Sequence, residues 1–210
     1  MSNLYIDKRR DLTKLKSKNI TFFPSRKMKS SIVTECPLES NLCYYFEFDD
    51  SITSYESQPL GYYYMYKGER HTYTPDFEVF TGTTSYYIEV KSKLELSKFV
   101  DFDDWFNAVK NQAVRLGKDL VLKKEQSILH HPTYQNYLQL YRCLRVEYDY
   151  NFICRIQTQL NANQLLPISA LISSSSELPC LYKLIAERIV ELSPPEQLLT
   201  LDSTVSWRKK

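Results

Sequence analysis

Two acidic residues and a lysine lie in an order that suits metal-dependent chemistry on phosphodiesters. Asp76 follows a proline, and Glu89 and Lys91 are separated by one residue. On a strand, side chains two residues apart project from the same face, so Glu89 and Lys91 lie side by side while Ile88 and Val90 point into a core. Carboxylates are preferred ligands of Mg²⁺, and a bound divalent ion activates water. This set therefore predicts hydrolysis of a phosphodiester.

We expect Asp76, Glu89 and the carbonyl of Val90 to hold one or two Mg²⁺ or Mn²⁺ ions, with Glu39 as a third carboxylate. Lys91 is then placed to orient the attacking water or to stabilise charge on the phosphate. The simpler interpretations stay open: Glu89 and Lys91 also suit an exposed ion pair, and Glu39 suits a helix cap. Three other acids compete with Glu39 for the third position, namely Glu35, Glu47 and Glu56.

The surrounding pattern predicts a helix and a largely antiparallel sheet that bring these residues together. Pro37 and the apolar stripe that follows it favour a helix, and alternating apolar residues favour strands. The predicted elements are a helix over 37–48, strands over 52–56, 60–70, 76–80 and 86–91, a helix over 103–116 and a strand over 119–123. Asp76 then opens one strand of a hairpin that turns at 81–84. The tyrosines of 62–66 suit sheet packing, with base stacking as the alternative.

Composition restricts the class of protein. The chain has 210 residues, of which 43% are hydrophobic and 25% charged, as in an ordinary globular protein. No apolar run is long enough to cross a bilayer and no signal peptide opens the chain, so we expect no membrane association. The five cysteines have no Cys-x-x-Cys spacing, which favours reduced thiols and a cytoplasmic location over a zinc site or disulfides.

The positive charge gathers at one end of the chain. Residues 1–30 contain nine Lys and Arg against two Asp, whereas the net charge of the whole chain is only +2. A basic arm of this kind favours contact with the phosphates of DNA. A solvated tail is the alternative interpretation.

The last third of the chain has a different pattern, which predicts a separate helical domain. We expect helices over 134–145, 150–160, 168–172 and 180–192, followed by a hairpin of 198–201 and 204–207. Helices followed by a hairpin are the order of a winged-helix domain. The sequence thus predicts three parts: a basic arm over 1–30, a catalytic domain over 31–127, and a winged-helix-like domain over 128–210 that binds a partner or DNA.

Several of these segments, taken in order, resemble one family. The matching segments are Glu39–Asp49, Tyr55–Pro59 with its Gln-Pro pair, Thr74–Phe77, Ile88–Lys91 and Tyr134–Leu140. In order and spacing they are similar to TnsA, the endonuclease subunit of heteromeric transposases, over about residues 26–145. The short chain looks similar to the compact versions found in CRISPR-associated transposons.

The resemblance implies a restriction-endonuclease-like domain, which is a mixed sheet flanked by helices. The catalytic residues of the family map onto Glu39, Asp76 and Lys91. Some members of the family carry Gln at the position of Glu89. The resemblance also implies cleavage of the 5′ strand at each end of a transposon in double-stranded DNA. A TnsB-type DDE transposase would process the 3′ strand, and the C-terminal domain would engage a TnsC-type AAA+ ATPase.

Two other functions fit the same residues. The first is a stand-alone restriction or repair nuclease of the same fold, which needs no partners. The second is a non-catalytic DNA-binding adaptor whose nuclease-like half serves only as a scaffold. Cutting by the isolated protein distinguishes the first, and failure to bind Mg²⁺ or Mn²⁺ distinguishes the second.

Overall fold

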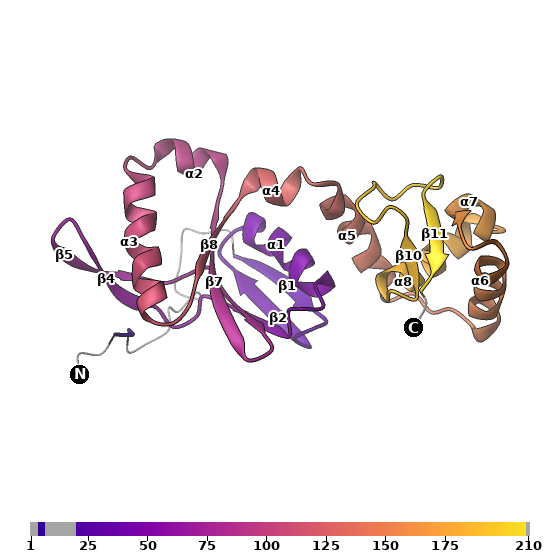
Figure 1. The fold of residues 1–210 in the computed structure, drawn as a ribbon, viewed down its shortest axis with the longest axis horizontal. Helices are drawn as coiled ribbons and strands as arrows, with labels where there is room; N and C mark the ends of the chain where they lie inside the picture. Colours follow the sequence, from indigo (N-terminus) through magenta and orange to yellow (C-terminus); the bar gives the residue numbers. More distant parts are fainter. Residues whose placement is uncertain (1–3, 7–19, 209–210) are drawn as a thin grey trace. The chain divides into compact units, whose positions relative to one another are not determined.

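The computed structural model describes residues 4–6 and 20–208. The chain divides into two compact units, Met1–His130 and His131–Lys210 (Figure 1). The division lies close to the boundary predicted at residue 127.

The first unit is built on a four-stranded mixed sheet. Its strands are β3 (Ser54–Ser57), β6 (Phe77–Thr81), β7 (Thr84–Lys91) and β8 (Leu120–Lys124), in the spatial order β3-β6-β7-β8. The first three are antiparallel neighbours, whereas β8 runs parallel to β7. A parallel pair needs a crossover connection, which the helices between β7 and β8 provide. The predicted fold class, a mixed sheet flanked by helices, is confirmed.

Helices lie on both faces of this sheet (Figure 1). On one face lies α1 (Pro37–Phe48), whose Phe46 packs with its ring centroid 4.9 Å from that of Tyr55 and 5.2 Å from that of Phe77. On the other face lies α3 (Phe102–Arg115), which buries Val109 and Ala113. Both helices and all four strands lie close to their predicted positions. The structure adds two short helices, α2 (Lys93–Lys98) and α4 (Glu125–Leu129), that were not predicted.

Because β7 is an interior strand with helices on both faces, the predicted alternation between buried and surface positions is wrong there. Ile88 and Val90 are buried as expected, but Tyr87 and Glu89 are buried as well, and Glu89 is only 4% exposed. The hairpin between β6 and β7 turns as predicted. Gly82 at its tip has φ +62°, a conformation that glycine adopts without strain.

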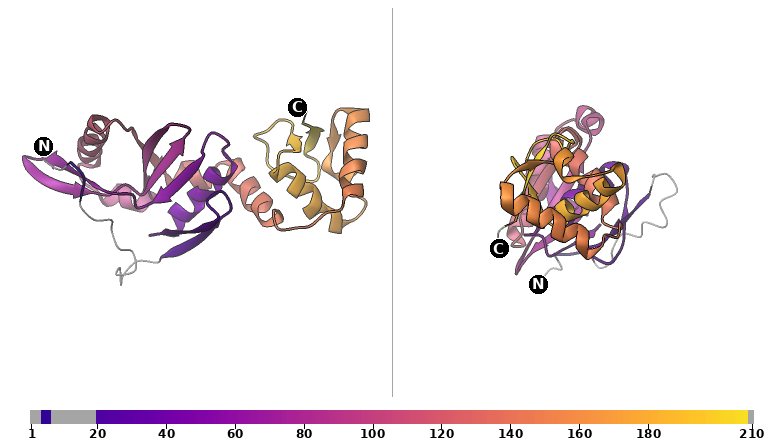
Figure 2. Two further views of the ribbon diagram at one scale, coloured as in Figure 1. Left: turned by 90° about the horizontal axis from the view of Figure 1, so that it is seen from below. Right: turned by 90° about the vertical axis from the view of Figure 1, so that its right-hand side faces the viewer.

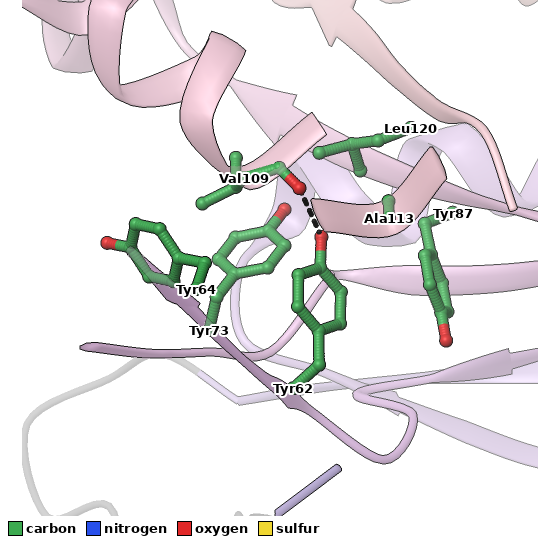
Figure 3. Packing of buried hydrophobic residues seen from close by; sticks show 7 residues of the cluster. All are labelled: Tyr62, Tyr64, Tyr73, Tyr87, Val109, Ala113 and Leu120. Atoms are coloured by element: carbon green, nitrogen blue, oxygen red, sulfur yellow. Dashed lines mark hydrogen bonds between the residues drawn. The ribbon is translucent and has the colours of Figure 1, made fainter. Parts of the chain in front are cut away.

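A tyrosine-rich cluster fills the space beneath α3 (Figure 3). It comes mainly from the hairpin of β4 (Tyr62–Tyr66) and β5 (Glu69–Tyr73), which extends from one end of the unit (Figure 2). The Tyr62 hydroxyl donates to the Val109 carbonyl at 3.0 Å, and the Trp105 indole donates to the Tyr64 hydroxyl at 3.0 Å. Burial of Tyr62 and Tyr64 supports the interpretation of these tyrosines as packing residues.

Part of the predicted basic arm is folded. The strands β1 (Thr21–Ser25) and β2 (Ser30–Thr34) form an antiparallel hairpin, so the boundary predicted at residue 30 falls at the first residue of β2. In addition, the Ile6 N–H donates to the Gly61 carbonyl at 2.9 Å, next to β4. The rest of the arm, residues 1–3 and 7–19, lies outside the described residues.

The Glu47 carboxylate fastens the β1–β2 hairpin to the sheet. Its Oε2 accepts from the backbone N–H groups of Arg26 and Lys27, both at 3.0 Å. Its Oε1 accepts from the hydroxyls of Ser25 at 2.6 Å and Tyr55 at 2.8 Å. Glu47, a competitor for the third-carboxylate position in the sequence, is therefore occupied as a structural acceptor.

We expect Glu47→Gln to destabilise the protein by about 2–3 kcal/mol. The amide nitrogen that replaces one oxygen cannot accept from the two N–H groups or from the two hydroxyls, whichever pair it faces. Denaturation by urea measures this loss. Glu69→Gln is the matched control, because the Glu69 side chain is 81% exposed; it should cost less than about 0.5 kcal/mol. Equal stability of Glu47→Gln and the wild type would contradict the assigned role.

The second unit is a helical bundle with a small sheet. Its elements are α5 (Pro132–Cys143), α6 (Tyr150–Asn163), β9 (Leu166–Pro167), α7 (Ile168–Leu171), the 3₁₀ turn η2 (Ser175–Glu177), α8 (Leu178–Ala186), β10 (Val190–Leu192) and β11 (Thr204–Trp207). The sheet order is β10-β11-β9. Its core buries Leu160, Leu181 and Val205 completely or almost so.

Two predictions for this unit are wrong in detail. The helix predicted over 180–192 ends at Ala186, because Arg188 has φ +55° and breaks the helical path. The strand β11 pairs with Val190–Leu192, not with 198–201 as predicted. The apolar residues of 189–192 continue a helical spacing, which hid the strand in the sequence.

All five cysteines are free. Within the described part of the chain, none of the helices combines the length and the apolar character needed to span a membrane.

Candidate metal centre in an acidic cleft

An acidic cleft of about 580 Å³ lies where the end of β7 meets the start of α1. Parts of α2 and α4 complete its wall. Besides Lys91 and several apolar and small polar residues, its lining contains five carboxylates: Glu35, Glu39, Asp76, Glu95 and Glu125. We call this space the acidic cleft. Among the predicted ligands, Asp76, Val90 and Glu39 line it directly.

Asp76 lies one residue before β6 and is held by three hydrogen bonds to two segments, β7 and the residue that follows β3. Its Oδ2 accepts from the Val90 N–H at 2.7 Å, and its own N–H donates to the Ile88 carbonyl at 3.0 Å. Its carbonyl accepts from the Gln58 N–H at 2.9 Å. The short hairpin turn fixes this register, so Asp76 stands opposite the end of β7 as the sequence predicts.

Glu89 and Lys91 form a close ion pair on β7. The Lys91 ammonium lies 2.5 Å from Glu89 Oε1 and 3.3 Å from the Val90 carbonyl oxygen. Their side chains are 5% and 17% exposed, so this is not the exposed surface pair that sequence reasoning left as the alternative. A buried pair of this kind requires further hydrogen bonds to be favourable. The other Glu89 oxygen, Oε2, accepts such a bond from the Tyr73 hydroxyl at 2.6 Å.

Glu39 takes part in the N-terminal cap of α1. Cys36 is the N-cap, and its Sγ accepts from the Glu39 N–H at 3.5 Å. The Glu39 carboxylate accepts from the Glu35 N–H at 2.9 Å and from the Cys36 thiol at 3.3 Å. Burial and the Glu39 charge raise the pKa of Cys36 to about 12, so the thiol remains protonated. The capping role is therefore real, and Glu39 also lines the acidic cleft.

The other acidic residues near the site differ in whether they line the acidic cleft. Glu35 lines the acidic cleft, whereas Glu47 and Glu56 do not. Glu78, which shares a face with Asp76 in the sequence pattern, is buried and paired with the Lys118 ammonium, while the Ser85 hydroxyl donates to it at 2.7 Å. It serves the sheet and not the cleft.

Sequence reasoning missed two acids of the cleft and one contact to Glu89. Glu95 caps α2 by accepting from the Ser92 N–H at 2.9 Å, and Glu125 accepts from the Lys93 N–H at 2.8 Å. Ser92 and Glu95 have the spacing of a capping box, a signal that was available in the sequence. The bond from Tyr73 to Glu89 joins strands of two different sheets, so the local spacing of residues in the sequence does not predict it.

The charges in the cleft shift two pKa values. Burial, followed by the charges of Glu89 and Glu39, raises the pKa of Asp76 well above its ordinary value, and Lys91 only partly offsets this. Burial alone would lower the pKa of Lys91, but the charges of Glu89 and Asp76 outweigh it and raise that pKa. The carboxylates around Asp76 therefore outweigh Lys91 in their effect on its pKa.

The donor set fits a hard cation. The predicted ligand atoms are all oxygens, the donors that Mg²⁺ prefers, and Mg²⁺ usually keeps several waters besides one or two carboxylates. The ammonium of Lys91 already lies against Glu89 Oε1 and the Val90 carbonyl, so these atoms attract positive charge in the folded chain. Across residues 4–6 and 20–208, no group of three or more His, Cys, Asp or Glu side chains could hold a metal by itself. Main-chain oxygen, water or phosphate would have to complete the shell.

We expect Asp76→Asn to stabilise the metal-free protein at neutral pH by about 1 kcal/mol, or about 2–4 °C in thermal midpoint. The raised pKa means that, above the ordinary carboxyl pKa, folded protein binds more protons than unfolded protein. Below the ordinary carboxyl pKa, the stability that protonated Asp76 contributes is fully present. It is lost as the pH rises through the raised pKa of the folded protein. Thermal unfolding in a chelator should thus show the gain of the variant growing from pH 4 to pH 7, and a constant gain would contradict it.

Comparison of the chain with protein-family models finds no matching family, and comparison with curated proteins finds no matching sequence. The residues and geometry of the acidic cleft are therefore the basis on which a function is inferred.

Proposed function

We propose that the first unit is a metal-dependent DNA endonuclease whose active site is the acidic cleft. The observation that carries the proposal is that Asp76 and Lys91, from the adjoining ends of two paired strands, line one cleft with Glu39. Glu89 is not among the lining residues, but it pairs with Lys91 and its charge acts on Asp76. Two carboxylates, a main-chain carbonyl and a lysine are the groups that phosphodiester hydrolysis requires.

Each residue has a separate part in this proposal. Asp76, Glu89 and the Val90 carbonyl would hold Mg²⁺ or Mn²⁺, and Glu39 would add negative charge or a further ligand. When bound, such an ion supplies an activated water and neutralises charge on the phosphate. The Val90 N–H donates to Asp76 Oδ2 at 2.7 Å, and the Gln58 side-chain amide donates to Oδ1 at 3.5 Å, so the protein orients both oxygens of this carboxylate. Lys91 would leave Glu89 to orient the water or to bind a phosphate oxygen.

The biological setting that we propose is transposition. The ordered resemblance to TnsA supports cleavage of the 5′ strands at transposon ends, in company with a TnsB-type transposase and a TnsC-type AAA+ ATPase. In the second unit, the order α6, β9, α7, α8, β10, β11 supports the proposal of a winged-helix-like module that engages a partner or DNA. Its three-stranded sheet includes the β10–β11 hairpin that would be the wing.

A strand-specific cleavage assay tests this function. The purified chain is incubated with end-labelled transposon-end DNA and Mg²⁺, alone and with a TnsB-type transposase and a TnsC-type ATPase. Nicking of the 5′ strand that needs both Mg²⁺ and the partners is the expected result.

Other results of the assay would select another function. Efficient cutting of plasmid DNA by the isolated chain would favour a stand-alone nuclease. Absence of calorimetric Mg²⁺ and Mn²⁺ binding, with DNA or partner binding preserved, would refute catalysis and favour a DNA-binding adaptor.

A further inference from the structure

The Glu89 carboxylate is held from two sides by groups of different kinds. Lys91, on the same strand, donates to Oε1 at 2.5 Å, and Tyr73, on the β4–β5 hairpin, donates to Oε2 at 2.6 Å. Lysine is a flexible side chain, and the proposed mechanism requires it to leave Glu89. Among the described residues, the Tyr73 hydroxyl then remains as the side-chain hydrogen-bond donor to this carboxylate.

Tyr73 is itself rigidly placed. Tyr73 is 7% exposed, and its ring lies in the tyrosine-rich cluster beneath α3 (Figure 3). The ring centroid lies 5.3 Å from that of Tyr62, 6.4 Å from that of Tyr64 and 5.7 Å from that of Trp105, each in an edge-on arrangement. Aromatic packing of this kind fixes both the position of the ring and the direction of its hydroxyl.

We propose that Tyr73 is a positioning residue that holds Glu89 in the orientation needed to bind the metal ion. This inference rests on the proposed function and adds a residue that the Asp-Glu-Lys pattern does not contain. A hydroxyl that donates to one oxygen of a ligating carboxylate fixes the carboxylate plane and leaves the other oxygen for the ion. Outer partners of this kind commonly change metal affinity by about 10–100-fold when they are removed.

The structure offers a matched pair of variants to test the role. Tyr73→Phe removes the hydroxyl on Glu89 and keeps the ring. Tyr62→Phe removes a buried hydroxyl of the same cluster, which donates to the Val109 carbonyl and not to the site. Both are made in the full chain, shown to be folded by near-ultraviolet circular dichroism, and titrated with Mn²⁺ by calorimetry. The Mn²⁺ concentration that gives half-maximal DNA cleavage is measured in parallel.

We expect Tyr73→Phe to weaken Mn²⁺ binding by about 10–100-fold and to raise the half-maximal Mn²⁺ concentration by a similar factor. Much of the cleavage rate should return at saturating Mn²⁺. Tyr62→Phe should leave both quantities within about twofold of the wild type, although its thermal midpoint falls. A purely structural role for Tyr73 would lower the thermal midpoint without moving the Mn²⁺ affinity.

A second comparison tests whether Tyr73 affects Mn²⁺ affinity through Glu89. In a Glu89→Gln background, Tyr73→Phe should cause no further loss of Mn²⁺ affinity. An equal loss in both backgrounds would overturn the inference, as would wild-type affinity of the single variant. If the wild type itself binds no Mn²⁺, the proposed endonuclease fails together with this inference. If the wild type binds and Tyr73→Phe matches it, only the role of Tyr73 fails.

Discussion

Asp76→Asn is expected to reduce DNA cleavage by at least about 10³-fold while leaving the fold intact. A metal ion supplies several kcal/mol of stabilisation to the transition state, and each 1.36 kcal/mol corresponds to a factor of ten in rate. Asp76 lines the acidic cleft, and its carboxylate is placed by the Val90 N–H, so the amide keeps this contact but is a poorer ligand. The rate of 5′-strand nicking at saturating Mg²⁺, with all partners present, measures the loss.

Glu78→Gln is the matched control for this experiment. Glu78 lies on β6, two residues beyond Asp76, and its carboxylate is bound by Lys118 and Ser85 away from the cleft. The control should lose stability, because it breaks a buried ion pair, but it should cleave DNA within about threefold of the wild type once folded. Cleavage by Asp76→Asn at the rate of this control would refute the assignment of Asp76.

Lys91→Met is expected to separate metal binding from chemistry. Cleavage should fall by about 10²–10³-fold, the usual loss on removal of one group that stabilises charge in the transition state. Metal affinity should be retained or increased, since the variant removes the ammonium that lies against Glu89 Oε1 and the Val90 carbonyl. Calorimetry with Mn²⁺ and the cleavage assay, performed on the same preparation, report the two effects.

Lys118→Met provides the comparison for Lys91. Lys118 also pairs with a buried glutamate of the sheet, Glu78, yet it does not line the acidic cleft. Its removal should destabilise the protein and leave both metal affinity and the cleavage rate per folded molecule unchanged. Loss of metal binding in Lys91→Met would show that Lys91 supports the ligands and is not a separate catalytic group.

The parts of the fold that sequence reasoning predicted correctly have strong local signals. The helix Pro37–Phe48 begins at a proline, has a regular apolar stripe, and was predicted with the bounds that the structure has. The turn between β6 and β7 is short, so the register that brings Asp76 opposite Glu89 follows from local spacing. The proximity of Asp76, Glu89 and Lys91 therefore depends only on the local segment 76–91.

The features that sequence reasoning missed depend on contacts between distant segments. The β1–β2 hairpin contains Pro24, one arginine and two lysines, a composition that resembles an unstructured arm, and the Glu47 carboxylate that stabilises the hairpin comes from the end of α1. The bond from Tyr73 to Glu89 depends on how the β4–β5 hairpin packs beneath α3. The burial of Glu89 depends on helices on both faces of β7. The spacing of apolar residues along the sequence does not predict any of these contacts.

The ammonium of Lys91 against Glu89 means that the protein itself supplies a counter-ion for this buried acid. Small domains organised around structural zinc collapse when the ion is withdrawn. In the proposed nuclease, in contrast, the Lys91 ammonium would balance the charge of Glu89 during folding, so that folding would need no divalent ion. An ion would then bind by displacing the ammonium from Glu89.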